Sequence, residues 1–266
     1  MARIAVAATA PFGADVLERL AGRHDVSALL TRPDARAGRG RKVAAPPAKA
    51  VAERLGIPVR QPERPTAGLE LEAPTVVVCA YGLLIPEELL AERLWLNVHP
   101  SLLPRWRGAA PVERAVMEGD EETGVTIHET VAELDAGPIA AQETFSIDRD
   151  DNAGSVYRRA AEVAVRLLDG VLAEGTLRFE PQRGEPTYAV RIGSADRALD
   201  LARPAAELVR TVRALSPHIG AGAVLEGKRV IVWDARVAAD GTFEPVEVQP
   251  EGGKRMSAEA WRRGLR

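Results

Sequence analysis

Cysteine is almost absent from this sequence, and several familiar motifs are missing altogether. The single cysteine, Cys79, cannot form a disulfide within the chain and is typical of proteins from a reducing cytoplasm. No stretch approaches the ~18–20 consecutive apolar residues of a membrane-spanning helix. The chain also lacks Cys-x-x-Cys and His-Glu-x-x-His, so the sequence predicts no metal site. Without a Gly-x-Gly-x-x-Gly turn or a Walker loop, nothing predicts a dinucleotide or nucleoside triphosphate site.

Charge of either sign is not in large excess. The 266 residues include 35 Lys and Arg against 38 Asp and Glu, a formal net charge of −3. Any contact with nucleic acid must therefore come from a local basic patch. The length suggests about two domains, and 46% hydrophobic with 27% charged residues is typical of a globular protein.

The first part of the chain alternates between strand-like and helix-like stretches. Strands are predicted at 3–8, 26–30, 75–80 and 94–98, separated by helices at 14–21, 46–55 and 86–92. The stretch 75–80 is continuously apolar, which is typical of a parallel strand buried on both faces. This order predicts an α/β fold with a Rossmann-like, doubly wound and mostly parallel sheet.

The rest of the chain changes character. Two strands (124–131 and 139–147) and a helix (155–173) are followed by a charged segment rich in Pro and Gly. A further helix at 204–215 and short strands within 222–248 predict a small β-rich domain. We therefore expect a first domain at 1–180, a linker at 181–203 and a second domain at 204–266.

Polar side chains that could take part in catalysis lie close together where one predicted strand ends. Asn97 and His99 are two residues apart on the strand 94–98 and its end, so both should face the same side. Ligands of open parallel sheets bind beyond the carboxyl ends of the strands. Asp135 arrives in a turn between two later strands, and amide, imidazole and carboxylate form a set suited to acyl transfer. Ser101 could act as a nucleophile instead, but the usual Gly-x-Ser-x-Gly turn is missing. His128 could face either the sheet or the site.

A second feature is the arginine loop at 32–42. Its basic residues surround two glycines and are opposed only by one aspartate; they include Arg36, Arg39, Arg41 and Lys42. By charge alone the loop could be a solvated surface segment. Clustered arginines on flexible backbone can also grip phosphates and the end of an RNA strand.

These motifs resemble those of a known family. Asn-Val-His-Pro-Ser-Leu-Leu-Pro-Arg-Trp-Arg-Gly at 97–108 and Leu-Asp-Ala-Gly at 134–137 resemble the folate-dependent formyltransferases. Three further segments, 31–42, 80–86 and 249–258, resemble the members that act on methionyl-tRNA. The resemblance implies transfer of a formyl group from 10-formyltetrahydrofolate to the amino group of initiator methionyl-tRNA, in the cytoplasm, without a metal.

The resemblance also implies roles for individual residues. Asn97, His99 and Asp135 match the catalytic amide, imidazole and acid, and either Asp135 or a water that it orders would be the general base. The folate pocket would be lined by Ser101, Leu102, Leu103, Pro104, Tyr81, Gly82, Leu83 and Leu84. The RNA contacts would come from Arg36, Arg39, Arg41 and Lys42.

The second domain would resemble an OB barrel, which has five strands. The stretch 237–248 is too short to supply all the strands of such a barrel, so we expect a truncated barrel. A monomer is the favoured state. Two alternatives stay open: an N-formyltransferase that acts on a small amine, namely a nucleotide-linked amino sugar or glycinamide ribonucleotide, and a folate- or RNA-binding protein without turnover.

Overall fold

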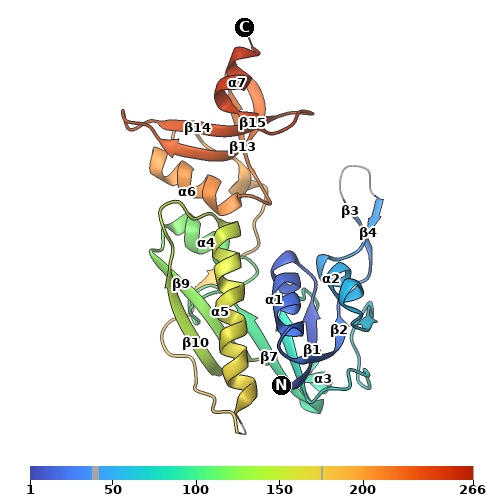
Figure 1. Ribbon diagram of the computed structural model, residues 1–266. Coiled ribbons are helices and arrows are strands. Elements are labelled where there is room, and N and C mark those ends of the chain that lie inside the picture. The colour runs from blue at the N-terminus through green and yellow to red at the C-terminus, as the bar shows by residue number, and fades with distance from the viewer. Residues whose placement is uncertain (38–41, 175, 266) are drawn as a thin grey trace. The chain divides into compact units, whose positions relative to one another are not determined.

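The chain divides into two compact units. The computed structural model describes residues 1–37, 42–174 and 176–265 (Figure 1). The first unit comprises Met1–Arg107, Gly124–Thr144 and Arg158–Thr187, and the second comprises Gly108–Thr123, Phe145–Tyr157 and Tyr188–Arg266. None of the helices in the described part is long and apolar enough to cross a bilayer. The domain limits expected from the sequence stay a prediction.

A seven-stranded sheet with the order β10-β9-β7-β6-β1-β2-β5 runs through the first unit. Its strands are β1 (Arg3–Ala8), β2 (Asp25–Leu30), β5 (Val59–Arg60), β6 (Thr75–Cys79), β7 (Leu94–His99), β9 (Glu122–Glu129) and β10 (Ile139–Ser146). The pairs β1–β2, β1–β6, β2–β5 and β6–β7 are parallel, and β7–β9 is antiparallel. The predicted mostly parallel sheet is confirmed.

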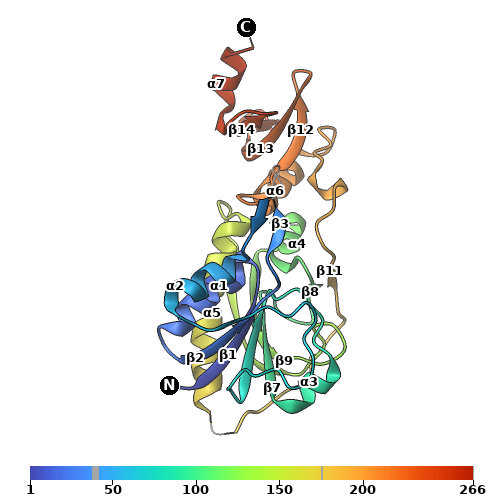
Figure 2. The same cartoon turned by 90° about the vertical axis from the view of Figure 1, so that its right-hand side faces the viewer.

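Helices cover both faces of this sheet. In Figure 2, α1, α2 and α5 lie on one face and α3 on the other. Their bounds are α1 (Pro11–Ala21), α2 (Pro47–Leu55), α3 (Glu87–Glu92) and α5 (Ala153–Ala173). Helix α1 begins with a proline, which suits the first helical position, and buries Val16, Leu17 and Leu20. Gly13 lets this helix approach β6, because a Cβ there would lie 2.3 Å from the Cys79 carbonyl oxygen.

Two short features were not expected from the sequence. Strands β3 (Ala35–Ala37) and β4 (Lys42–Ala44) pair in antiparallel fashion at the two ends of the arginine loop. Strands β8 (Arg107–Gly108) and β11 (Tyr188–Ala189) form another two-stranded sheet. Such short strands carry too few residues for a period of two to be recognised.

The second unit is an antiparallel sheet with helices. The described strands form one sheet in the order β12-β13-β14-β15, from β12 (Ala221–Leu225), β13 (Lys228–Val237), β14 (Phe243–Pro250) and β15 (Met256–Ser257). The helical elements are α4 (Pro111–Glu118), η1 (Ala195–Arg197), α6 (Ala205–Leu215) and α7 (Ala258–Arg263). Val212, Val232 and Trp261 belong to its apolar core. The predicted small β-rich domain is confirmed, and its described strands number one fewer than those of an OB barrel.

Candidate active site

Strand β7 carries two of the predicted site residues into the middle of the sheet. Parallel pairing with β6 on one side and antiparallel pairing with β9 on the other fix its register, with Asn97 opposite His128 and His99 opposite Thr126. His99 is 4% exposed and Asn97 is half-buried. The alternation of side chains along a strand places both on one side, as the sequence predicts.

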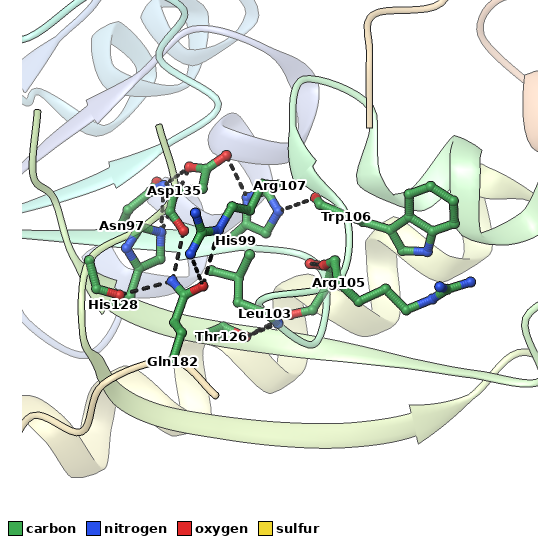
Figure 3. Close-up of polar contacts among 12 residues, drawn as sticks. Asn97, His99, Leu103, Arg105, Trp106, Arg107, Thr126, His128, Asp135 and Gln182 are labelled. Carbon is green, nitrogen blue, oxygen red and sulfur yellow. Dashed lines mark hydrogen bonds and ion pairs between the residues drawn. The ribbon is translucent and has the colours of Figure 1, made fainter. Parts of the chain in front are cut away.

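Asp135 reaches these two residues from the turn that follows β9 (Figure 3). Its Oδ1 accepts a hydrogen bond of 3.1 Å from the Asn97 amide nitrogen, and its Oδ2 lies 3.7 Å from His99 Nδ1. The backbone of Asp135 is left-handed, with φ of 49°, a conformation that Asp tolerates better than most residues. The three predicted side chains therefore converge on one point, although their sequence positions span 38 residues.

The hydrogen bonds of His99 fix which ring nitrogen carries a proton. His99 Nε2 lies 2.8 Å from the carbonyl oxygen of Trp106. Because a carbonyl can only accept, Nε2 is the donor. Nδ1 is then the nitrogen that faces the Asp135 carboxylate, and it carries a proton only in the charged imidazolium.

His128, for which the sequence left open whether it faces the sheet or the site, is a member of this cluster. It is 1% exposed, and its Nδ1 donates to the Glu129 carbonyl oxygen at 2.8 Å. Its Nε2 lies 3.1 Å from Asn97 Nδ2 and accepts one of the amide hydrogens. Burial lowers the pKa of His128 to about 4, so the ring is neutral near pH 7.

The orientation of the Asn97 amide follows from its two neighbours. A neutral imidazole nitrogen and a carboxylate oxygen both accept hydrogen bonds, so the NH2 group must face them. Both amide hydrogens therefore have protein acceptors. Asn97 can donate to a substrate oxygen only after one of these bonds is released.

The loop after β7 is shaped by hydrogen bonds of its own. Ser101 is buried, and its hydroxyl donates to the Arg105 carbonyl oxygen at 2.6 Å. The Thr126 hydroxyl donates to the Ser101 carbonyl oxygen at 2.7 Å and accepts from the Leu103 amide at 3.2 Å. The Ser101 hydroxyl is therefore committed to the loop backbone and not to the His99 ring, which argues against a serine nucleophile. Leu103 is buried, whereas Leu102 and Pro104 are half-buried.

The segment 81–84, which is predicted to line the folate pocket, follows β6. Tyr81 is buried within the apolar core, and burial raises the pKa of its hydroxyl to about 12. Gly82 adopts a φ of 76°, which favours glycine. Leu83 is half-buried, and the side chain of Leu84 is 82% exposed. This segment thus combines a core residue with an exposed apolar one.

The predicted RNA-binding residues are described only in part. Arg36 is exposed on β3. Lys42 begins β4. Arg39 and Arg41 lie outside the described residues. The role of all four stays a prediction.

Three further residues border the cluster and were missed by the sequence analysis. Arg107 and Gln182 hydrogen-bond to each other, and Gln182 reaches the Asp135 turn. The third is Trp106, whose carbonyl meets His99. None of these three residues carries a signal in the sequence, because their contacts depend on how distant segments pack. Within the described ranges, no three His, Cys, Asp or Glu side chains are grouped to hold a metal ion.

Known families and relatives match this chain over nearly its whole length. Residues 2–172 match the formyl transferase family, and residues 191–244 match the formyl transferase C-terminal domain. The methionyl-tRNA formyltransferase of Paracoccus denitrificans is 39% identical over 290 aligned residues, which cover 99% of this chain and 97% of that protein.

Solved structures share the fold. HypX from Aquifex aeolicus in complex with tetrahydrofolic acid aligns with a TM-score of 0.68 and 20% identity, covering 98% of this chain and 46% of that one. A 4-N formyltransferase from Francisella tularensis aligns with a TM-score of 0.69 and 19% identity, covering 87% and 96%. By the extent of the family match and the identity to relatives over nearly its whole length, the chain belongs to the formyl transferase family.

Proposed function

We propose that this protein transfers the formyl group of 10-formyltetrahydrofolate to the free amino group of initiator methionyl-tRNA in the cytoplasm. The observation that carries the proposal is the convergence of Asn97, His99 and Asp135 at the end of β7. It occurs in a chain that aligns with the methionyl-tRNA formyltransferase of Paracoccus denitrificans over 99% of its own length.

The residues around the cluster suit a folate. The Leu84 side chain offers exposed apolar surface for a flat ring. The nearby Tyr81 hydroxyl is buried and has no hydrogen-bond partner among the described residues, a situation that a polar ring edge or a water would relieve. Ser101, Leu102, Leu103 and Pro104 would form the adjoining wall. When bound, 10-formyltetrahydrofolate supplies a formyl carbon that is open to attack by an amine.

His99 and Asn97 would act on the formyl oxygen. Because His99 Nε2 is committed to the Trp106 carbonyl, Nδ1 is the ring nitrogen that would face the substrate. Asn97 would exchange one of its two present acceptors for the formyl oxygen, to which negative charge moves during attack. One well-placed donor of this kind typically contributes about 10²–10³ in rate.

Asp135 would serve two purposes. Its Oδ1 fixes the Asn97 amide, and its Oδ2 faces the edge of His99. The attacking amine must lose a proton, and Asp135, or a water that it orders, would accept it. The proposal includes both candidates for the base, the Asp135 carboxylate and a water that it orders.

The acceptor would be held by the arginine loop. The ribbon of β3 and β4 presents Arg36, and the loop sequence adds Arg39, Arg41 and Lys42. Basic side chains here would bind the phosphates of the acceptor stem, and such contacts weaken steeply as salt rises.

A second candidate has one observation in its favour. If Asn97 turns its amide from His128 to the formyl oxygen, Nε2 of neutral His128 would be free to accept from a small amine, and the fold is shared with a 4-N formyltransferase from Francisella tularensis. In this reading the substrate is an amino-sugar nucleotide or glycinamide ribonucleotide. Such substrates would not need the arginine loop.

One assay separates these functions. Formyl-labelled 10-formyltetrahydrofolate is offered in parallel with methionyl-tRNA, an amino-sugar nucleotide and glycinamide ribonucleotide. We expect label in methionyl-tRNA alone. Label in a small amine would support the second candidate, and folate binding without transfer to any acceptor would contradict both enzymatic readings.

A further inference from the structure

The segment 180–187, which includes the start of the predicted linker at 181–203, is attached to the site of the first unit. Its first residue, Glu180, exchanges two backbone hydrogen bonds with Ile139, at 2.7 and 2.9 Å. Its last residue, Thr187, accepts from the Trp106 amide through its hydroxyl at 2.9 Å, and its own amide donates to the Pro104 carbonyl oxygen at 3.2 Å. The segment is therefore held at both ends.

Between these ends, the side chain of Gln182 meets the Asp135 turn (Figure 3). Its Nε2 donates to the Asp135 carbonyl oxygen at 2.7 Å and to the Gly137 carbonyl oxygen at 2.9 Å. Its Oε1 accepts from Arg107 Nε at 3.2 Å and Nη2 at 2.9 Å. Both donor hydrogens and both lone pairs of this amide are thus used.

The turn that Gln182 holds is strained and tight. Asp135 has a positive φ, which is less favourable than the usual conformations although Asp tolerates it better than most residues. A Cβ on Gly137 would lie 1.8 Å from the Glu129 carbonyl oxygen, so the turn leaves no space for a side chain at this position. Besides bonding to Gln182, Arg107 contacts the turn directly, through Nη1 to Glu133 at 3.0 Å. Gln182 and Arg107 therefore brace the turn on which the carboxylate is carried.

The same segment also acts on the imidazole. Thr187 holds the backbone around Trp106 by two bonds. The Thr187 hydroxyl accepts from the Trp106 amide, and the Thr187 carbonyl oxygen accepts from the Arg107 amide at 2.8 Å. The Trp106 carbonyl is in turn the acceptor that orients His99. One short segment thus sets the position of two groups of the cluster.

We propose that Gln182 is a positioning residue for formyl transfer, which holds the Asp135 turn so that the carboxylate meets Asn97 and His99. This role rests on the proposed function. The Gln182 side chain bonds to Arg107 and to the backbone of the turn, and it acts on Asn97 and His99 through that turn. Its loss should therefore affect the chemical step more than the binding of either substrate.

Two variants separate the donor half of the amide from the acceptor half. Gln182→Leu removes both halves at similar size. Gln182→Glu keeps an acceptor for Arg107 but sets a carboxylate against two carbonyl oxygens, so it cannot donate to the turn. The matched control is Glu185→Leu, a change at an exposed position of the same segment.

The readouts are steady-state formylation of methionyl-tRNA and hydrogen exchange of the amides at 133–137. For both Gln182 variants, kcat should fall at least tenfold while KM for folate and for tRNA changes less than threefold. The amide of Ala136, which donates to the Glu133 carbonyl oxygen at 3.3 Å, should exchange faster. The control should match wild type, and thermal unfolding should show all variants folded at the assay temperature.

The outcomes are distinct. Wild-type kcat in Gln182→Glu, or unchanged exchange at 133–137 in both variants, would overturn the proposal. A wild-type protein that formylates none of the offered acceptors would refute the proposed function instead. In that case the exchange measurement still decides whether Gln182 holds the turn.

Discussion

Acidification should destabilise the fold through His128. The pKa of this buried ring is about 4, against 6.5 for an ordinary histidine, and burial is the main cause. Protonation of Nε2 would also set a new N–H against the Asn97 amide hydrogens. In the unfolded chain His128 is exposed to water, so it takes up a proton below about pH 6.5.

The sign and size of the effect follow from linkage. Above pH 6.5 both states are neutral at this ring, so the free energy of unfolding is unaffected. Between pH 6.5 and 4 the unfolded state binds more protons, so stability falls as the pH falls. At 1.36 kcal/mol per pH unit, His128 accounts for a loss of about 2 kcal/mol by pH 5 and about 3 kcal/mol by pH 4.

The test compares urea denaturation of wild type and His128→Gln between pH 7.5 and 4.5. Glutamine can accept from Asn97 but does not titrate, so the variant should lose less stability on acidification than wild type. His218→Gln, at an exposed histidine, serves as the control and should follow wild type. Parallel curves for wild type and His128→Gln would refute the reasoning.

Two further predictions concern the loops. Ser101→Ala should lower the free energy of unfolding by about 1 kcal/mol, because the bond to the Arg105 carbonyl oxygen is lost, and should still turn over; complete loss of activity in a folded variant would restore the nucleophile reading. The pair Arg39→Ala and Arg41→Ala should raise KM for methionyl-tRNA at least tenfold and leave KM for folate unchanged. Unchanged kinetics with charged tRNA at moderate salt would remove the proposed role of the loop.

The core of the site was within reach of sequence reasoning because it depends on local rules. A period of two along 94–98 puts Asn97 and His99 on one side, and the parallel-sheet pattern puts the strand end at a binding edge. Asp135 was visible as a carboxylate two residues before a glycine, in the turn between two predicted strands. Each of these inferences needs a few neighbouring residues and no knowledge of packing.

The supporting residues depend on tertiary structure and were therefore missed. Gln182 lies in a segment rich in Pro, Gly and charge, and such composition is typical of a linker. Its role comes only from where that segment crosses the Asp135 turn. The same is true of the Trp106 carbonyl, because backbone acceptors leave no mark in the sequence. The sequence predicts a loop where β3 and β4 pair, since three-residue strands give no periodic signal.

The most direct measurement of the central claim is single-turnover formylation of methionyl-tRNA by wild type and Asp135→Asn. The change keeps the size of the side chain but removes the charge that faces His99 and the carboxylate that accepts from Asn97. A rate at least 10²-fold lower, with folate binding retained, is the result that we predict. A wild-type rate in the variant would show that the three side chains do not act together on the formyl group.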